Sequence, residues 1–371
     1  MDELYLRLNY VRNFCVSIFP CITKKYGETN FYPLFHSSLT ANGHDPIICF
    51  LVGQRLQGNL LTELGLLPGL QSLVLPFNEI TGSIPSTFAS LRQLHNLELH
   101  GNKLTSTIPE EFCDPDSGHS ITRFNVAFNR LTGTIPSKIS LWENLKFFVV
   151  SQNNLSGTIP TEIGLVDLVH LQLNSNELSG TLPTELGLLT RASSLFLQEN
   201  YFTGTIPSEI GGLSKLEELS MFGKNGETPE RLVGTIPTQL YSLTNLRLFN
   251  LSWQQLTGTI PTIAGNMTSL IEFNLSRNKL EGTIPTELSN IKRLEVLHVH
   301  LNEMTGSMPT EVCDLSSLKL LQTDCNPEEN PAIPCLCCTA CCDRTKQDCW
   351  KVGVPPRPPS EKEAFSRYCR T

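Results

Sequence analysis

A tetrapeptide that returns about every 24 residues constrains this chain more than any other feature of its sequence. Gly-Thr-Ile-Pro, or a close variant, ends at ten prolines, and successive prolines are 23 to 30 residues apart: Pro85, Pro109, Pro136, Pro160, Pro183, Pro207, Pro237, Pro261, Pro285 and Pro309. Such a period is typical of a solenoid, in which each unit packs mainly against its neighbours. The chain is therefore predicted to form one elongated repeat domain rather than the two or three domains that 371 residues suggest.

The aligned repeats read L-x-x-L-x-L-x-x-N-x-L-x-G-x-I-P-x-x-L-x-x-L-x-x. Leucines at positions 4 and 6, such as Leu73 and Leu75, alternate inward as on a short strand. The asparagine at position 9 is expected to satisfy backbone groups of the turn after the strand, so that successive amides form a ladder. Eleven full repeats start at Pro46, Leu70, Leu94, Ile121, Leu145, Leu168, Ala192, Leu216, Leu246, Leu270 and Leu294, and a partial one starts at Leu318.

This pattern, over residues 46 to 326, resembles the plant-type leucine-rich repeat with the L-x-G-x-I-P signature. Receptor-kinase ectodomains, receptor-like proteins and polygalacturonase inhibitors carry that signature. The segment Cys335-Leu-Cys-Cys-Thr-Ala-Cys-Cys342 also resembles the endings of predicted algal leucine-rich-repeat proteins. The resemblance implies an α/β repeat solenoid of about eleven 24-residue repeats. We expect a right-handed superhelix with a parallel β-sheet on its concave side.

Four regions are predicted on this basis. Residues 1–45 form an atypical N-terminal segment or partial cap, residues 46–317 the solenoid, residues 318–342 a cysteine-rich C-terminal cap, and residues 343–371 a proline-containing basic tail. No run of 18 apolar residues predicts a membrane span. Pro20 interrupts the only short apolar run near the start, so no signal peptide is predicted, which an incomplete N-terminus would explain.

Thirteen cysteines, most of them near the C-terminus, favour an oxidised cap and the secretory route. The last repeat of a solenoid exposes its core edge, and a short capping segment needs covalent support. The disulfide candidates are Cys313, Cys325, Cys335, Cys337, Cys338, Cys341, Cys342 and Cys349. A four-cysteine zinc site is the alternative, because Cys338 and Cys341 have C-x-x-C spacing.

Side chains at positions 2, 3, 5, 7 and 8 of each repeat are expected to face solvent on the concave sheet. Aromatic residues and arginine there indicate a binding surface, because these residue types dominate interface energies. The ligand-binding candidates are Phe128, Phe196, Phe222, Trp253, Arg277, His298 and His300. The alternative is ordinary scattered apolar exposure. His298 and His300 are expected to be a solvated pair, so no metal site is predicted.

Four sequons mark candidate glycosylation sites, which matter only for a secreted protein: Asn154, Asn250, Asn266 and Asn274. Two of them, Asn250 and Asn274, fall on the concave face of adjacent repeats. Glycans at these positions would cover the sheet beside Trp253 and move a protein contact toward the ends of the arc.

A net charge of −8 argues against nucleic acid as a partner. No catalytic constellation appears, so neither an enzyme nor a cofactor is predicted. The resemblance implies an extracellular or cell-surface module that binds a protein, peptide or glycan ligand, with a co-receptor as a further partner and the membrane reached only through a missing segment or that partner. The alternative is a matrix or ice-binding scaffold that uses a periodic threonine column: Thr107, Thr134, Thr158, Thr181, Thr205, Thr235, Thr259 and Thr283.

Overall fold

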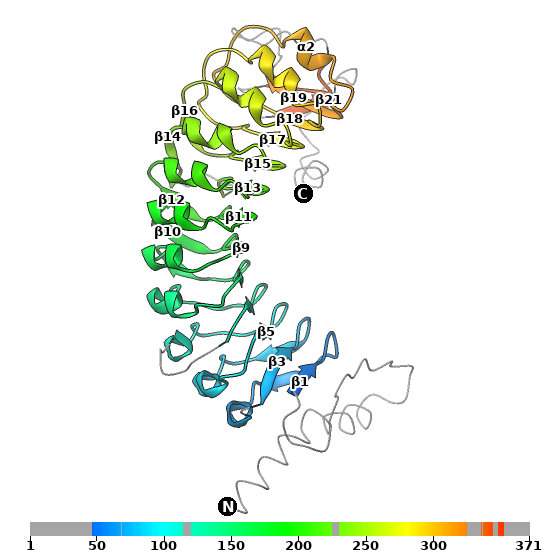
Figure 1. The fold of residues 1–371 in the computed structure, drawn as a ribbon. Coiled ribbons are helices and arrows are strands. Elements are labelled where there is room, and N and C mark those ends of the chain that lie inside the picture. Colours follow the sequence, from blue (N-terminus) through cyan, green and yellow to red (C-terminus); the bar gives the residue numbers. More distant parts are fainter. Residues whose placement is uncertain are drawn as a thin grey trace, which may run out of the picture.

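The computed structural model in Figure 1 is an arc-shaped solenoid with strands along its inner side and short helices along its outer side. The structure describes residues 47–67, 69–113, 120–224, 230–324, 335, 337–343 and 348–351. The predicted N-terminal segment, residues 1–45, lies outside the described residues, as does most of the predicted tail.

One long sheet lines the concave side, and the prediction of a parallel sheet is confirmed there. Its fourteen described strands follow chain order, and all neighbours pair in parallel except the last two, which are antiparallel. They are β1 (Ile47–Phe50), β3 (Leu70–Val74), β5 (Asn96–Glu98), β6 (Arg123–Asn125), β7 (Phe147–Val149), β9 (His170–Gln172), β11 (Ser194–Phe196), β13 (Glu218–Ser220), β15 (Leu248–Asn250), β17 (Glu272–Asn274), β18 (Val296–His298), β19 (Leu320–Asp324), β20 (Ala340–Asp343) and β21 (Asp348–Lys351).

The sheet runs through the predicted boundary at residue 317 without interruption, because β19 pairs in parallel with β18. It also includes residues of the predicted tail, since β21 pairs antiparallel with β20. The C-terminal cap is therefore an extension of the solenoid sheet by a hairpin.

The convex side is built from short helices, most of them 3-10 helices that directly follow the proline of the repeat; the helix at Thr62–Leu66 follows Leu61 instead, and the one at Thr310–Cys313 is an α-helix. At Pro136, for example, φ is −60° and the carbonyl accepts a hydrogen bond from the amide of Ile139 (3.1 Å), which starts the helix. The described helices are η1 (Thr62–Leu66), η2 (Ser86–Ser90), η3 (Glu110–Cys113), η5 (Ser137–Leu141), η6 (Thr161–Leu165), η7 (Thr184–Leu188), η8 (Ser208–Gly212), η9 (Thr238–Ser242), η10 (Thr262–Asn266), η11 (Thr286–Asn290) and α2 (Thr310–Cys313).

Short strands on one flank connect the two sides, and two of them, at Glu177–Thr181 and Val233–Thr235, contain a Gly-Thr pair. They form three small parallel ladders, each between consecutive repeats. The strands are β2 (Gln57–Asn59) with β4 (Glu79–Thr81), β8 (Ser156–Gly157) with β10 (Glu177–Thr181) and β12 (Tyr201–Thr203), and β14 (Val233–Thr235) with β16 (Gln255–Thr257).

The predicted asparagine ladder is confirmed. Asn153 donates to the carbonyl oxygens of Val126 (3.0 Å) and Val150 (3.1 Å), and its Oδ1 accepts from the amide of Leu131 (2.9 Å). Gln254 stands where one repeat lacks asparagine, and its longer side chain makes equivalent bonds to the neighbouring repeat. The same pattern of donated and accepted bonds occurs at Asn78, Asn102, Asn129, Asn176, Asn200, Asn278 and Asn302.

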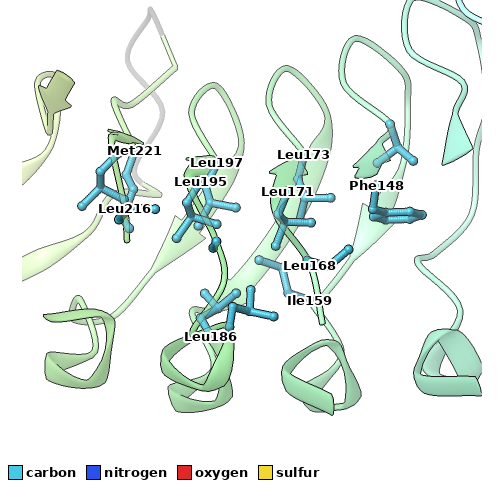
Figure 2. Packing of buried hydrophobic residues seen from close by; sticks show 14 of the residues in the cluster. Phe148, Ile159, Leu168, Leu171, Leu173, Leu186, Leu195, Leu197, Leu216 and Met221 are labelled. Carbon is cyan, nitrogen blue, oxygen red and sulfur yellow. The ribbon is translucent and has the colours of Figure 1, made fainter. Parts of the chain in front are cut away.

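The hydrophobic core lies between the sheet and the helices. Figure 2 shows side chains of successive turns, such as Leu171 and Leu195, on the strand side of this core, and Leu186 directed into it from a helix on the convex side. In the first half of the solenoid the core is aromatic, and neighbouring ring centroids lie 5.0 to 6.4 Å apart among Phe88, Phe112, Phe124, Trp142 and Phe148. This rigid core holds the concave strands in fixed register.

Candidate functional site

Four side chains at position 3 of successive repeats form a continuous row across the middle of the concave sheet. We call Arg123, Phe147, His170 and Ser194 the central row. Each is paired in register with the next across strands β6, β7, β9 and β11. Because position 3 faces the same side in every strand, the backbone brings together residues that are about 24 apart in sequence.

The contacts within the central row are close. The guanidinium carbon of Arg123 lies 3.9 Å from the ring centroid of Phe147. Phe147 stacks on His170 with centroids 4.8 Å apart and planes inclined by 16°. Nδ1 of His170 lies 2.5 Å from Oγ of Ser194, and the two share a hydrogen bond. Arg123, Phe147 and His170 thus form one partly exposed surface that combines a cation with aromatic faces, and the row ends at Ser194, which is buried.

The electrostatics of the central row favour a neutral histidine. Burial is the main cause that lowers the pKa of His170 below its ordinary value; the Glu218 and Glu217 charges oppose this shift, and the Arg123 charge supports it. Arg123, Phe147 and His170 are each partly exposed, so a ligand can reach them. A neutral imidazole stacked on a phenyl ring suits an apolar or planar ligand group, while the guanidinium suits an anionic one.

Phe147 and His170 were not among the residues that the sequence predicted as ligand-binding. The prediction followed positions 5, 7 and 8 and did not compare neighbours along position 3. The signal was present in the sequence, because Arg123, Phe147 and His170 occupy the same position in consecutive repeats.

The structure places the predicted Phe196, Phe222 and Trp253 on successive turns, but in a diagonal. Phe196 pairs with Ser220, so Phe222 lies two residues farther along its own turn. All three side chains are partly exposed, and within the described residues they make no ring contact with one another. The contact found there is between Trp253 and the predicted Arg277, whose guanidinium carbon lies 4.0 Å from the indole ring centroid.

Position 8 of the repeat is a left-handed turn residue rather than part of the flat sheet, which corrects our expectation. Phe128, Trp253 and Arg277 have φ of 54°, 58° and 58°. Phe128 projects from this turn with 54% of its surface exposed. Residues at position 8 therefore border the sheet at the ends of its strands.

The expectation that His298 and His300 form a solvated pair is wrong for His300, which is buried, whereas His298 is partly exposed. Only 7% of the surface of His300 is exposed. Burial lowers the pKa of His298 to about 4 and that of His300 to about 3. The reason is the cap, which continues the sheet beyond β18 and brings Cys342 and Cys349 close to His300.

A basic groove runs beside the starts of strands β11 to β18. Its volume is about 560 Å³, and it is lined by Arg191, Ser193, Lys215, Glu217, Asn245, Arg247, Ser269 and Arg293. Four cations and one carboxylate line it, although the whole chain has a net charge of −8. Arg191 pairs with Asp167 at 2.9 Å, and Arg247 lies 3.8 Å from Glu217. The groove is a local site of positive charge on an acidic protein.

Comparison with known proteins agrees with this geometry. The leucine-rich-repeat family model matches residues 69–91, 93–115, 167–189 and 269–291. The chain is a leucine-rich-repeat solenoid. A TDR receptor structure matches with a TM-score of 0.68 and 29% identity over 75% of this chain and 46% of that one. The plant peptide hormone receptor RGFR1, solved in complex with RGF2, matches with a TM-score of 0.62 and 31% identity over 73% of this chain and 46% of that one.

The leucine-rich-repeat solenoid thus spans less than half the length of these two receptor chains. A plant ice-binding protein has a TM-score of 0.52 and 23% identity over 77% of this chain and 83% of that one, which shows a common fold. A comparison with curated proteins found no match. Among the described residues, no helix has the length and apolar character needed to cross a membrane.

The cap of the solenoid is oxidised. Cys313 is bonded to Cys337, Cys335 to Cys338, and Cys342 to Cys349. Cys341 is disulfide-bonded as well, and Cys325 lies outside the described residues. These bonds use the sulfur atoms that the alternative zinc site at Cys338 and Cys341 would need. Cys113, by contrast, is a free thiol in the core, where burial raises its pKa to about 12.

The four sequons differ in accessibility. Asn154 and Asn266 are exposed. Asn250 is only 9% exposed, and its Oδ1 accepts a hydrogen bond from the Ser252 hydroxyl at 2.7 Å. Asn274 is half-buried and makes the same bond to the serine two residues later. A glycan on Asn250 would have to break this packing, so the structure does not favour the expected glycan cover beside Trp253.

The threonine column forms a regular exposed row on the flank of the solenoid. The methyl group of each threonine packs against the glycine of the next repeat: a Cβ added to Gly157, at φ +78°, would lie 2.9 Å from Cγ2 of Thr134. All eight threonines are exposed: Thr107, Thr134, Thr158, Thr181, Thr205, Thr235, Thr259 and Thr283.

Proposed function

We propose that this protein is a non-catalytic recognition module, outside the cell or at its surface, that binds a peptide or a peptide segment of a protein along the middle of its concave sheet. The observation that carries the proposal is the central row, in which Arg123, Phe147 and His170 stack into one accessible surface. The likeness to a plant peptide hormone receptor solved with its peptide supports this class of ligand. A co-receptor is a further partner in this proposal.

The arrangement of the row suits an extended peptide. Rings that are fixed by stacking lose little conformational entropy when a ligand covers them, and they present a large apolar area. Arg123 can donate to a carboxylate or a backbone carbonyl while its plane stays on Phe147. The basic groove lies toward the starts of the neighbouring strands and raises the local concentration of acidic segments.

A displayed library of 12-residue peptides, selected on the immobilised full chain, tests this proposal. Peptides enriched on the wild type should bind Phe147→Ala/His170→Ala at least 10-fold more weakly, because the stacking surface is gone. The matched control is Leu165→Ala/Leu188→Ala, which removes two exposed apolar side chains from the convex side. Equal binding to all three proteins, or loss only in the convex control, would contradict the proposal.

A second candidate function rests on the threonine column. Neighbouring strands are about 4.8 Å apart, so a threonine from each repeat gives a row of regularly spaced, exposed hydroxyl and methyl groups that can face a periodic surface such as a matrix or ice. Thr158→Lys/Thr181→Lys/Thr205→Lys should abolish inhibition of ice recrystallisation if this function is real. No inhibition by the wild type would exclude ice binding, and the peptide selection remains independent of it.

A further inference from the structure

A buried histidine lies against a disulfide where the cap meets the last repeats. A ring nitrogen of His300 and the sulfur atoms of Cys342 and Cys349 all lie within 4.8 Å of one another. Nδ1 of His300 is buried and has no hydrogen-bond partner. Because buried polar atoms are nearly always satisfied, an unsatisfied ring nitrogen directed into a protein interior calls for an explanation.

We propose that Cys342, Cys349 and His300 form a metal site that the disulfide keeps closed, and that reduction opens it to a thiophilic divalent cation such as zinc. Two thiolates and an imidazole are the ligand types that Zn²⁺ prefers in tetrahedral sites. The fourth tetrahedral position is left to a water molecule, because no further His, Cys, Asp or Glu among the described residues belongs to this cluster.

The cap holds the two sulfurs together whether or not they are bonded. Cys342 and Cys349 are direct partners in the antiparallel pairing of β20 with β21, with Cα atoms 4.0 Å apart. β20 itself is paired with β19, and β19 with β18. Breaking the S–S bond therefore leaves two thiols side by side, close to His300, on a backbone that the sheet still positions.

Opening the site takes two steps, reduction of the Cys342–Cys349 disulfide and binding of the metal ion. A phosphine or a dithiol transfers two electrons to the disulfide, and each sulfur takes up one proton. Binding of Zn²⁺ then displaces both thiol protons and gives a dithiolate, so the bound ion and its two thiolates have no net charge, which suits a buried site.

The imidazole is already in the form that binds metal. Burial, with smaller effects from His298 and Arg277, lowers the pKa of His300 to about 3, so the ring is neutral and its lone pair is available at neutral pH. Asp324 ends β19, the strand between β18 and β20. Its carboxylate already accepts hydrogen bonds from the amides of Leu301 (2.6 Å) and Asn302 (3.1 Å), so we do not assign it as a ligand.

Cobalt(II) titration of the full chain, before and after reduction with tris(carboxyethyl)phosphine, tests the proposal. The oxidised protein should give no thiolate-to-cobalt charge-transfer band, and the reduced protein should give this band together with tetrahedral d–d bands. His300→Ala should weaken binding of this ion at least 10-fold. The matched control, His100→Ala, changes the histidine at the same repeat position near the other end of the solenoid and should leave the titration unchanged.

Other reduced cysteines of the cap can also bind cobalt, so two sulfur variants separate the sites. Cys342→Ser/Cys349→Ser should lose the histidine-sensitive bands, whereas Cys335→Ser/Cys338→Ser should keep them. If His300→Ala does not fold, as judged by circular dichroism of the oxidised protein, His300→Gln replaces it because its amide fills similar space. Cobalt spectra that are identical with and without His300, or binding that needs no reduction, would overturn the proposal.

Discussion

His100 and His300 occupy the same position of the repeat near opposite ends of the sheet, yet their surroundings differ. His100 is half-buried, makes an edge contact with the ring of Phe77 (5.0 Å) and lies 4.0 Å from the carboxylate of Glu98. His300 is buried against the disulfide of the cap. The repeat thus fixes the direction in which a side chain points, while the strands that follow decide whether it meets solvent or protein.

The side chains of the central row resemble His100 rather than His300 in exposure, since Arg123, Phe147 and His170 are partly exposed. Like His100 and His300, the row follows the repeat and has a paired strand on each side, but three of its four side chains remain accessible while the opposite face of the same strands packs on an aromatic core. Phe147 belongs to the central row, and its neighbour Phe148 faces the opposite side of β7, toward the core. A comparison of the two residues therefore tests whether the binding surface and the core are separate.

The largest expected effect is at Phe148, which is fully buried and stacks on Phe124 with ring centroids 5.7 Å apart. Phe148→Ala should lower the free energy of unfolding by about 3–5 kcal/mol, because it leaves a cavity in a close-packed core. Phe147→Ala, the matched control, should lose less than about 1 kcal/mol, since its ring is half-exposed. Urea denaturation measures both, and equal losses would refute the separation of core from binding surface.

The next largest effect is expected at the cap. Cys342→Ala/Cys349→Ala should cost about 2–3 kcal/mol, because the bond closes a short loop and restricts the unfolded chain. Hydrogen exchange should show the loss at the C-terminal end, for example at the amide of Val299, which bonds to the carbonyl of Gln322 in β19. The amide of Leu173, in the middle of the solenoid, should keep its protection, and comparable loss there would show that the two regions unfold as one unit.

A smaller effect concerns pH. Burial holds the pKa of His300 at about 3, whereas its ordinary value is 6.5. As pH falls below 6.5, the unfolded chain takes up a proton at this residue and the native protein does not, so stability falls with pH until about pH 3. Between pH 6.5 and 5, wild type should lose about 1–2 kcal/mol more than His300→Gln. Urea denaturation at the two pH values, with His100→Gln as control, would disprove this if the histidine variants behaved alike.

The sequence predicted most of the fold and less of the site, for a physical reason. The columns of leucine, asparagine and glycine are determined within one repeat and its nearest neighbour, so the period alone predicts the sheet and the ladder. The environment of His300 depends on Cys342 and Cys349, which are some 40 to 50 residues away and outside the period. The central row could have been predicted from the sequence, because Arg123, Phe147 and His170 stand at the same position of consecutive repeats.

The smallest expected effect isolates one contact of the central row. Ser194→Ala removes the hydrogen bond to Nδ1 of His170 from a buried hydroxyl position, which should cost about 1 kcal/mol. Its neighbour Ser193 is half-buried and donates to the carbonyl of Val169 over a longer 3.3 Å, so Ser193→Ala should cost about half as much or less. Urea denaturation gives the energies, and the ¹⁵N shift of Nδ1 of His170 should change only in Ser194→Ala. If the shift moved equally in both variants, Ser194 would not be what orients His170, and the polar end of the row would have to be assigned to another group.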